Sequence, residues 1–307
     1  MQTNPSRTRL RRKTSRSRIA PVDSQRPLPV TVYTPESSLA SPATMLRDML
    51  RDLIASRELA WRLAVRDISA QYRQTALGLL WVLILPLANT LTWIFLSGTG
   101  VVAVGDTALP YAVYVFTGTM LWAIFMDALN APLQQTTAAK AMLAKLNFPR
   151  EALIVSGIYQ TLFNAGIKIA LLLAALLWLG VYPDASLLWF PLGVLSLILV
   201  GTAIGLLLTP VGMLYTDIGR GLPLVMQFLM YVTPVVFPMP KDGLAATLFQ
   251  LNPLTPILVT TRDWLTAQPV DLLGPFLLVN GLAVVLLLLV WVVYRLAMPI
   301  LIERMSA

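Results

Sequence analysis

Four polar side chains recur at every fourth position inside a long apolar stretch, and one of them is charged. They are Ser156, Gln160, Asn164 and Lys168, which share one face if the stretch is helical. An ammonium in the middle of an apolar span costs at least ~2.5 kcal/mol unless it faces water or a partner. Lys168 is therefore expected either to border a water-filled path with Gln160 and Asn164, or to pair with an acid such as Asp127 or with carbonyl groups.

Other kinds of chemistry are excluded by composition. The chain has no cysteine and no histidine, so thiolate metal sites and histidine-based catalysis are ruled out. Asp106, Asp184 and Asp217 are isolated in the loops, whereas enzymes that act on phosphates usually need paired carboxylates for a metal. A G-x-x-x-x-G-K-[ST] phosphate loop is also missing from the sequence. No cofactor is expected on this chain.

Aromatic side chains are a second group of candidates, because sugars stack their C–H faces on such rings. Trp93, Tyr114 and Trp122 lie in apolar stretches where they could line a path for a glycan. The alternative is an aromatic belt at a membrane surface, which uses the same residue types and which Trp178 and Tyr182 resemble.

The elements that must position these side chains are long apolar helices. The chain is 57% hydrophobic and only 12% charged, a composition foreign to soluble domains of this length. A helix needs about 20 apolar residues to cross a bilayer. Six stretches meet this length: 77–97, 110–129, 152–179, 187–209, 221–239 and 272–294. The sequence predicts an all-α polytopic membrane protein with six transmembrane helices, within a domain at 77–295.

Basic residues set the orientation of these spans, because they stay on the cytoplasmic side. The connections at 134–151 and 215–220 carry lysine or arginine, and those at 98–109 and 180–186 carry none. Both termini are therefore expected in the cytoplasm, and the C-terminus is expected to form a cytoplasmic tail at 296–307. The long connection at 238–271 is predicted to be external although it holds Lys241 and Arg262.

The net charge of +8 is concentrated before the first span, where 14 of the 23 basic residues precede residue 74. Residues 1–40 lack apolar periodicity and are expected to be disordered. Such a basic arm could bind nucleic acid, bind anionic lipid or serve as a topology signal. The membrane spans that follow it favour the last two roles.

Residues 41–76 combine helical apolar periodicity with many charges, which is typical of helices lying in a membrane surface. Ser41-Pro42 and Ser56 are suitable helix starts. A small cytoplasmic helical hairpin is the alternative. The residues assigned to the interfacial surface are Arg57, Trp61, Arg66, Asp67, Tyr72 and Arg73.

The segment from Arg57 to Leu87 resembles the permease subunits of ABC-type polysaccharide exporters. The matching elements are Arg66-Asp67, Tyr72-Arg73, Leu77-Gly78, Trp81 and Pro86, with Leu146-Asn147-Phe148-Pro149-Arg150 and Leu251-Asn252-Pro253-Leu254-Thr255 further along. The resemblance extends over roughly residues 45–300. It implies export of a lipid-linked O-antigen, capsular polysaccharide or teichoic acid across the bacterial inner membrane. It also implies a homodimer with two ATP-binding subunits, which hold the ATP and Mg, and no nucleic acid.

Two segments receive roles from this resemblance. The polar segment at 134–150 would form a coupling helix that docks on the ATPase, through Lys140, Met142, Leu143, Lys145 and Arg150. A plain surface helix would have the same composition.

The apolar loop at 238–271 is predicted to hold two short helices, at 244–251 and 255–265, broken at Asn252-Pro253 and at Pro256. The resemblance makes it a re-entrant external gate, with Asn252, Pro253, Arg262 and Trp264. Without the resemblance it is only a partly buried loop.

Two other functions remain open: a membrane-embedded polyprenyl-linked glycan transferase or ligase, and an ion-coupled secondary transporter. The scattered acids argue against the first. The second would want several ionisable residues at mid-membrane, where only Lys168 clearly qualifies.

Overall fold

The computed structural model describes residues 42–73, 80–102, 105, 107–143, 145 and 148–306. The chain divides into two compact units, Met1–Leu46 and Arg47–Ala307. In the first unit only residues 42–46, which begin the first helix, are described. The expected disordered arm at 1–40, the Ser41 cap and the Leu77-Gly78 step therefore lie outside the described residues.

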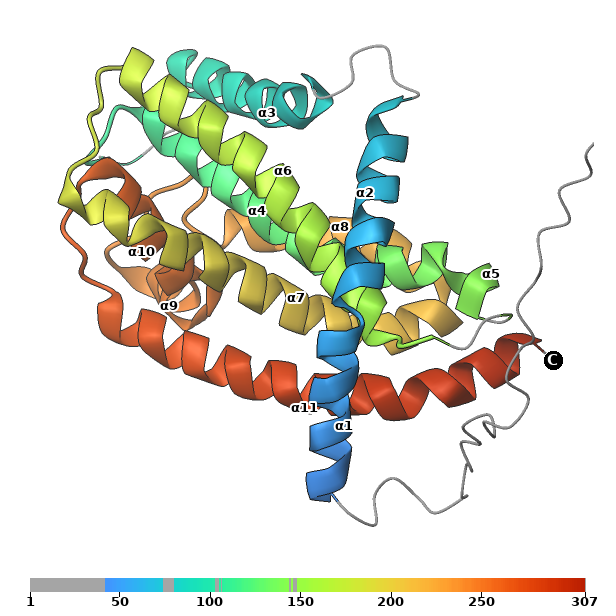
Figure 1. Cartoon of the computed structure of the whole chain (residues 1–307). Coiled ribbons are helices and arrows are strands. Elements are labelled where there is room, and N and C mark those ends of the chain that lie inside the picture. Colours follow the sequence, from blue (N-terminus) through green and yellow to red (C-terminus); the bar gives the residue numbers. More distant parts are fainter. Residues whose placement is uncertain are drawn as a thin grey trace, which may run out of the picture. The chain divides into compact units, whose positions relative to one another are not determined.

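All regular structure in the described part of the chain is helical (Figure 1). Hydrophobic segments interrupted by short polar or proline-containing connections account for this pattern. The elements are α1 Pro42–Ala55, α2 Arg57–Arg73, α3 Leu80–Gly98, α4 Tyr111–Ala138, α5 Lys140–Leu143, α6 Glu151–Trp178, the short 3-10 helix η2 Ala185–Leu188, α7 Phe190–Leu214, α8 Thr216–Tyr231, α9 Gly243–Leu251, α10 Leu254–Thr266 and α11 Leu273–Ser306.

Within the described residues, five helices are long and apolar enough to cross a membrane. They are Leu80–Gly98, Tyr111–Ala138, Glu151–Trp178, Phe190–Leu214 and Leu273–Arg304. They correspond to five of the six predicted spans. The protein is therefore a multi-pass, all-helical membrane protein.

The stretch predicted as the remaining span, 221–239, is organised differently. Its helix α8 begins earlier, at Thr216, and ends at Tyr231, after 16 residues. Turns follow through Val236. At about 1.5 Å per residue such a helix covers roughly 24 Å, short of the ~30 Å hydrocarbon core. Hydropathy alone could not find this end, because residues 232–237 are as apolar as the helix before them.

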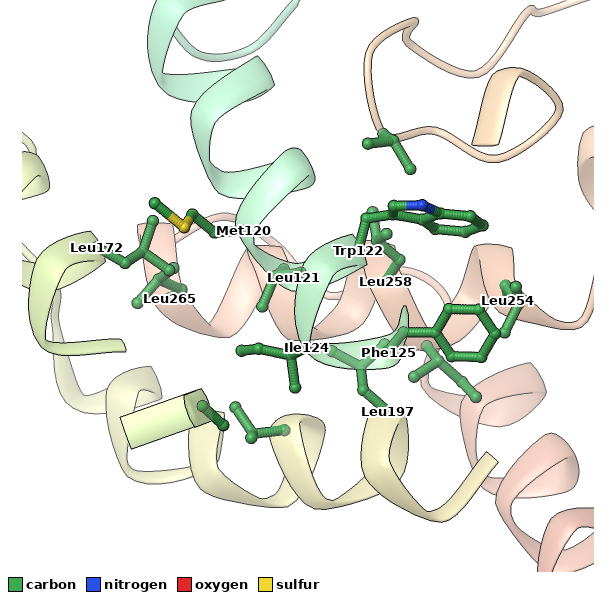
Figure 2. Close-up of a cluster of buried hydrophobic side chains, with 14 of the residues drawn as sticks. Met120, Leu121, Trp122, Ile124, Phe125, Leu172, Leu197, Leu254, Leu258 and Leu265 are labelled. Atoms are coloured by element: carbon green, nitrogen blue, oxygen red, sulfur yellow. The ribbon is translucent and has the colours of Figure 1, made fainter. Parts of the chain in front are cut away.

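Helix α4 is the centre of the packing, with α6 and α7 lying along it (Figure 1). Figure 2 shows the heart of the buried cluster, where residues of α4 meet side chains of α6, α7 and α10. Gly201 and Gly205 of α7 permit the closest approach, since a Cβ at either position would collide with the backbone of α4. This pair of glycines four residues apart therefore allows α7 to approach α4 closely.

A second buried cluster gathers around the polar segment between α4 and α6. Ala139 and Leu143 belong to it, together with Leu153 of α6 and with Tyr294 and Met298 of α11. The C-terminal half of α11 thus packs in the same apolar cluster as α5 and the start of α6.

The smaller helices follow the sequence predictions with one exception. Helices α1 and α2 meet at Ser56 as expected, and the Ser56 hydroxyl donates back to the Leu53 carbonyl oxygen at 2.8 Å. Helices α9 and α10 are separated at Asn252-Pro253 as expected. Pro256, however, does not break α10, because it falls in the first turn, where no intrahelical N–H is needed.

Candidate functional site

Lys168 pairs with an acid on the neighbouring helix. Its Nζ lies 2.6 Å from Asp127 Oδ2 and donates to the Ala123 carbonyl oxygen at 3.2 Å. The lysine is only 5% exposed, so these two acceptors replace the water that the ammonium would otherwise require. This is the partner that the packing interpretation of the sequence named.

The same ion pair also lies in the wall of a cavity. The cavity has a volume of about 490 Å³. It is formed mainly by α3, α4 and α6, and its lining is Gln71, Trp81, Val82, Pro86, Asn89, Thr119, Trp122, Ala123, Met126, Asp127, Asn164, Lys168 and Met230. The two predicted roles of Lys168 are therefore compatible, because pairing does not remove it from the wall of this cavity.

Only half of the predicted path residues meet at this cavity. Trp122, Asn164 and Lys168 line it. Gln160 instead donates to Asp67 of α2 at 3.2 Å. Trp93 packs edge-to-face on Tyr231 and Phe237.

Tyr114 is the third predicted path residue that is placed elsewhere. Its hydroxyl lies within hydrogen-bond distance of the carbonyl oxygens of Pro234 and Phe237, at 3.0 and 3.1 Å. This side chain lines a smaller cavity, described below.

Several cavity residues escaped the sequence analysis. Gln71, Trp81, Asn89 and Thr119 line the cavity from α2, α3 and α4. Their signal was weak, because single polar residues in apolar helices are common at helix contacts. Asp127 carried the clearest signal, as an acid inside a span.

Arg262 is held by backbone rather than by an acid. It is 3% exposed. Its Nη2 donates to the carbonyl oxygens of Pro234 at 2.8 Å and Val235 at 3.2 Å, and its guanidinium stacks over the Tyr114 ring with Cζ 3.8 Å from the centroid. No carboxylate forms an ion pair with it among the described residues.

Of the other predicted gate residues, Asn252 contacts the same turn. Asn252 donates from Nδ2 to the Val232 carbonyl oxygen at 3.1 Å and to the Thr233 hydroxyl at 2.7 Å, while its Oδ1 accepts from Leu254 N. Pro253 precedes α10 as its N-cap, and Trp264 packs edge-to-face on Phe276. Of these side chains, Asn252 holds the turn after α8 through its two donated hydrogen bonds.

A cavity of about 330 Å³ adjoins this turn. Tyr114, Arg262, Asp263 and Asp271 are among its lining residues. Burial raises the pKa of Asp263 to about 7, Arg262 opposes the rise and Asp271 adds to it. Asp263 is therefore partly protonated near neutral pH.

The predicted docking residues are divided between surface and interior. Lys140 and Lys145 are exposed and Met142 is half-buried, whereas Leu143 is 6% exposed and belongs to the apolar cluster with α11. Arg150 is the N-cap of α6. Leu143 is thus covered by this chain, whereas Lys140 and Lys145 are exposed and Met142 and Arg150 are half-buried.

The predicted interfacial residues lie on α2. Trp61 is exposed and packs edge-to-face on Tyr159 of α6, and Arg66 pairs with Asp67 at 2.7 Å. Arg57 and Arg73 are exposed. The Tyr72 side chain lies outside the described part of the structure.

No group of three or more histidine, cysteine or acidic residues that could hold a metal occurs within the described ranges.

A comparison of the sequence with known protein families agrees with the helical fold and with the missing phosphate loop. The ABC-2 type transporter family matches residues 58–264, and the chain belongs to this family. It is the transmembrane permease part of such a transporter, which binds no cofactor itself and works with an ATP-binding subunit on a separate chain.

The chain is also similar to individual curated proteins. The chain is 22% identical over 242 residues to the O-antigen export system permease protein RfbA of Myxococcus xanthus, covering 78% of this chain and 92% of the relative. It is also 22% and 21% identical over 203 residues to two RfbA proteins of Klebsiella pneumoniae, covering 64% of this chain and 76% of each relative.

Proposed function

We propose that this chain is the permease of an exporter that moves a lipid-linked polysaccharide across the bacterial inner membrane. The observation that carries the proposal is the likeness to O-antigen export permeases over 78% of the chain. The glycan is of the O-antigen, capsule or teichoic acid type. The chain serves as the passage, and hydrolysis of ATP on the partner subunit drives the movement.

The cavity beside Lys168 supports a glycan as the substrate. Trp81 and Trp122 are among the lining residues, as are Asn89 and Asn164, and indole rings can stack on the C–H surface of a sugar. The Lys168–Asp127 pair is neutral as a unit, with a donor and an acceptor side by side. Such a wall suits a ligand rich in hydroxyl groups and without net charge.

The working assembly is a homodimer with two ATP-binding subunits, with both termini of each permease in the cytoplasm. Large exposed apolar side chains support a further protein or lipid contact on α3, α8 and α11, among them Phe95, Phe228 and Leu278. Helix α8 with the following turn forms the remaining crossing of the six.

Contact with the ATP-binding subunit is made by the connection between α4 and α6. Lys140 and Lys145 are its exposed cations and Met142 its accessible apolar side chain. Helices α1 and α2 lie in the membrane surface, an arrangement supported by the exposed Leu50, Ile54 and Trp61. Asn252, Pro253, Arg262 and Trp264 form the frame of the external gate.

The test is deletion of the gene in the native bacterium, followed by measurement of surface polysaccharide and of lipid-linked polysaccharide inside the cell. Loss from the surface with accumulation inside supports the proposal, and the native chain should restore export. A Lys140→Glu, Lys145→Glu variant should insert but fail to restore export or to retain the ATP-binding subunit in detergent. Unchanged surface polysaccharide after deletion would refute the proposed substrate.

The matched control for that variant is Arg304→Glu, which reverses an exposed basic residue in the last turn of α11. It should support export. Equal loss with the control would mean that cytoplasmic charge in general, rather than the proposed docking surface, is required.

A further inference from the structure

Arg295 of α11 joins three helices through two ion pairs. Its Nη1 lies 2.8 Å from Glu151 Oε1, at the first residue of α6, and its Nη2 lies 2.7 Å from Asp52 Oδ2, near the end of α1. Each terminal nitrogen of the guanidinium thus has a different carboxylate. A planar arginine fork can hold two acids in this way, whereas a lysine ammonium is a single point of charge.

The position of Glu151 makes this junction more than a surface salt bridge. Glu151 is 5% exposed and is the first residue of α6, directly after the connection proposed to contact the ATP-binding subunit. Arg150, the N-cap of the same helix, interacts electrostatically with both Glu151 and Arg295. Two bases and two acids therefore balance at the point where this connection re-enters the helix bundle.

Apolar packing supports the same link. Leu143 of α5 and Leu153 of α6 share a buried cluster with Val290, Tyr294 and Met298 of α11. Arg295 stands beside Tyr294 in sequence, so the ion pairs lie next to this cluster. A displacement of the connection would therefore be transmitted to α11 through both the apolar cluster and the two ion pairs of Arg295.

We propose that Arg295 is a positioning residue for energy coupling, which makes the start of α6, α11 and α1 move together when the ATP-binding subunit displaces the connection at 139–150. The inference rests on the proposed docking of this connection. Arg295 touches neither substrate nor nucleotide in this role. Its contribution is to convert a local push into movement of the membrane helices.

The experiment measures ATP hydrolysis and export separately, in vesicles that contain the full chain with its native ATP-binding subunit. Arg295→Lys keeps one positive charge near the acids but cannot reproduce both contacts. Asp52→Asn removes the negative charge on the α1 side only and so weakens that contact without changing the one with Glu151. Both variants should keep ATP hydrolysis within about twofold of the native chain, while the amount exported per ATP falls about fivefold, within the usual range of coupling energies.

Two controls separate coupling from general damage. Asp48→Asn changes an exposed acid on the same helix as Asp52 and should leave both rates unchanged. Thermal unfolding in detergent should show that Arg295→Lys remains folded at the assay temperature. Failure of the Lys140→Glu, Lys145→Glu variant to alter ATP hydrolysis or subunit retention would refute the docking proposal itself.

The outcome that overturns this inference alone is specific. With docking established, an Arg295→Lys chain that exports the native amount per ATP would show that the fork has no coupling role. The same conclusion would follow if export and hydrolysis declined in equal proportion.

Discussion

Lys168 and Arg262, the buried cations among the residues that the structure describes, are stabilised in opposite ways. Lys168 faces a carboxylate at 2.6 Å and lines the larger cavity. Arg262 is held by two backbone carbonyl oxygens and an aromatic ring, with no ion pair to an acid in the described part of the chain. The lysine is thus neutralised by another side chain at a cavity wall, whereas the arginine satisfies carbonyl groups of the backbone.

Replacement of Arg262 should therefore have the largest effect on stability. Arg262→Met leaves the Pro234 and Val235 carbonyl oxygens without this donor and removes the stacking on Tyr114. Loss of buried hydrogen bonds to a charged group costs about 3 kcal/mol. Thermal unfolding in detergent should show a clear decrease in the midpoint, and Arg262→Lys should recover part of it. An unchanged midpoint would mean that water can replace the guanidinium in this turn.

Gly118 tests the space around the same arginine. A Cβ at this position would collide with the Val235 carbonyl oxygen and the Arg262 guanidinium, so Gly118→Ala should destabilise by about 1–3 kcal/mol. Gly166→Ala is the matched control, since nothing lies within 4 Å of its added Cβ. Thermal unfolding should separate the two variants, and equal midpoints would show that the turn after α8 moves freely.

Lys168→Leu should affect export more than stability. Asp127 keeps access to the cavity and can be hydrated there, so the cost to folding is only about 1–2 kcal/mol. Export should fall about tenfold, which corresponds to ~1.4 kcal/mol. The double variant Lys168→Leu, Asp127→Leu removes both charges and should restore stability. If it also restores export, the pair serves only helix packing and the comparison with Arg262 loses its functional side.

Asp263 gives the smallest effect, seen as a dependence on pH. The folded protein holds this proton more tightly than the unfolded chain, because burial raises the pKa to about 7. Stability is therefore greatest below the ordinary pKa near 4 and decreases as the pH rises through 7. Between pH 5 and pH 8 the loss should be about 1 kcal/mol after allowance for solvent screening.

Asp263→Asn should abolish this part of the pH dependence in thermal unfolding. Asp184→Asn is the control. Hydrogen bonds from Ser186 lower the pKa of the exposed Asp184, so it stays ionised from pH 5 to pH 8. A native chain whose midpoint does not change across this interval would contradict the assignment.

Sequence patterns located the features that repeat along the chain. Long apolar stretches gave five of the helices, and the four-residue spacing gave the face that holds Lys168. The break at Asn252-Pro253 was also evident, because proline restricts the residue before it. These signals are local, so one sequence is sufficient for them.

Features that depend on distant partners were not predictable. Gln160 faces Asp67 rather than the cavity, and Leu143 is covered by α11. The end of α8 at Tyr231 depends on distant side chains that donate hydrogen bonds to the carbonyl groups after it. These side chains come from α4, from the connection between α9 and α10, and from α10. No nearby residue type announces such an end.

The turn after α8 also has a consequence for the order of assembly. The carbonyl oxygens of Val232, Pro234, Val235 and Phe237 find their donors in Asn252, Tyr114 and Arg262. In an apolar environment these groups have no water to bond until those donors arrive. In a nascent chain that has not yet produced α10, we expect that α8 does not end at Tyr231. The helix either continues beyond this residue or frays before it. The fifth apolar stretch should therefore reach its final length only after synthesis has passed Arg262, although it is made earlier.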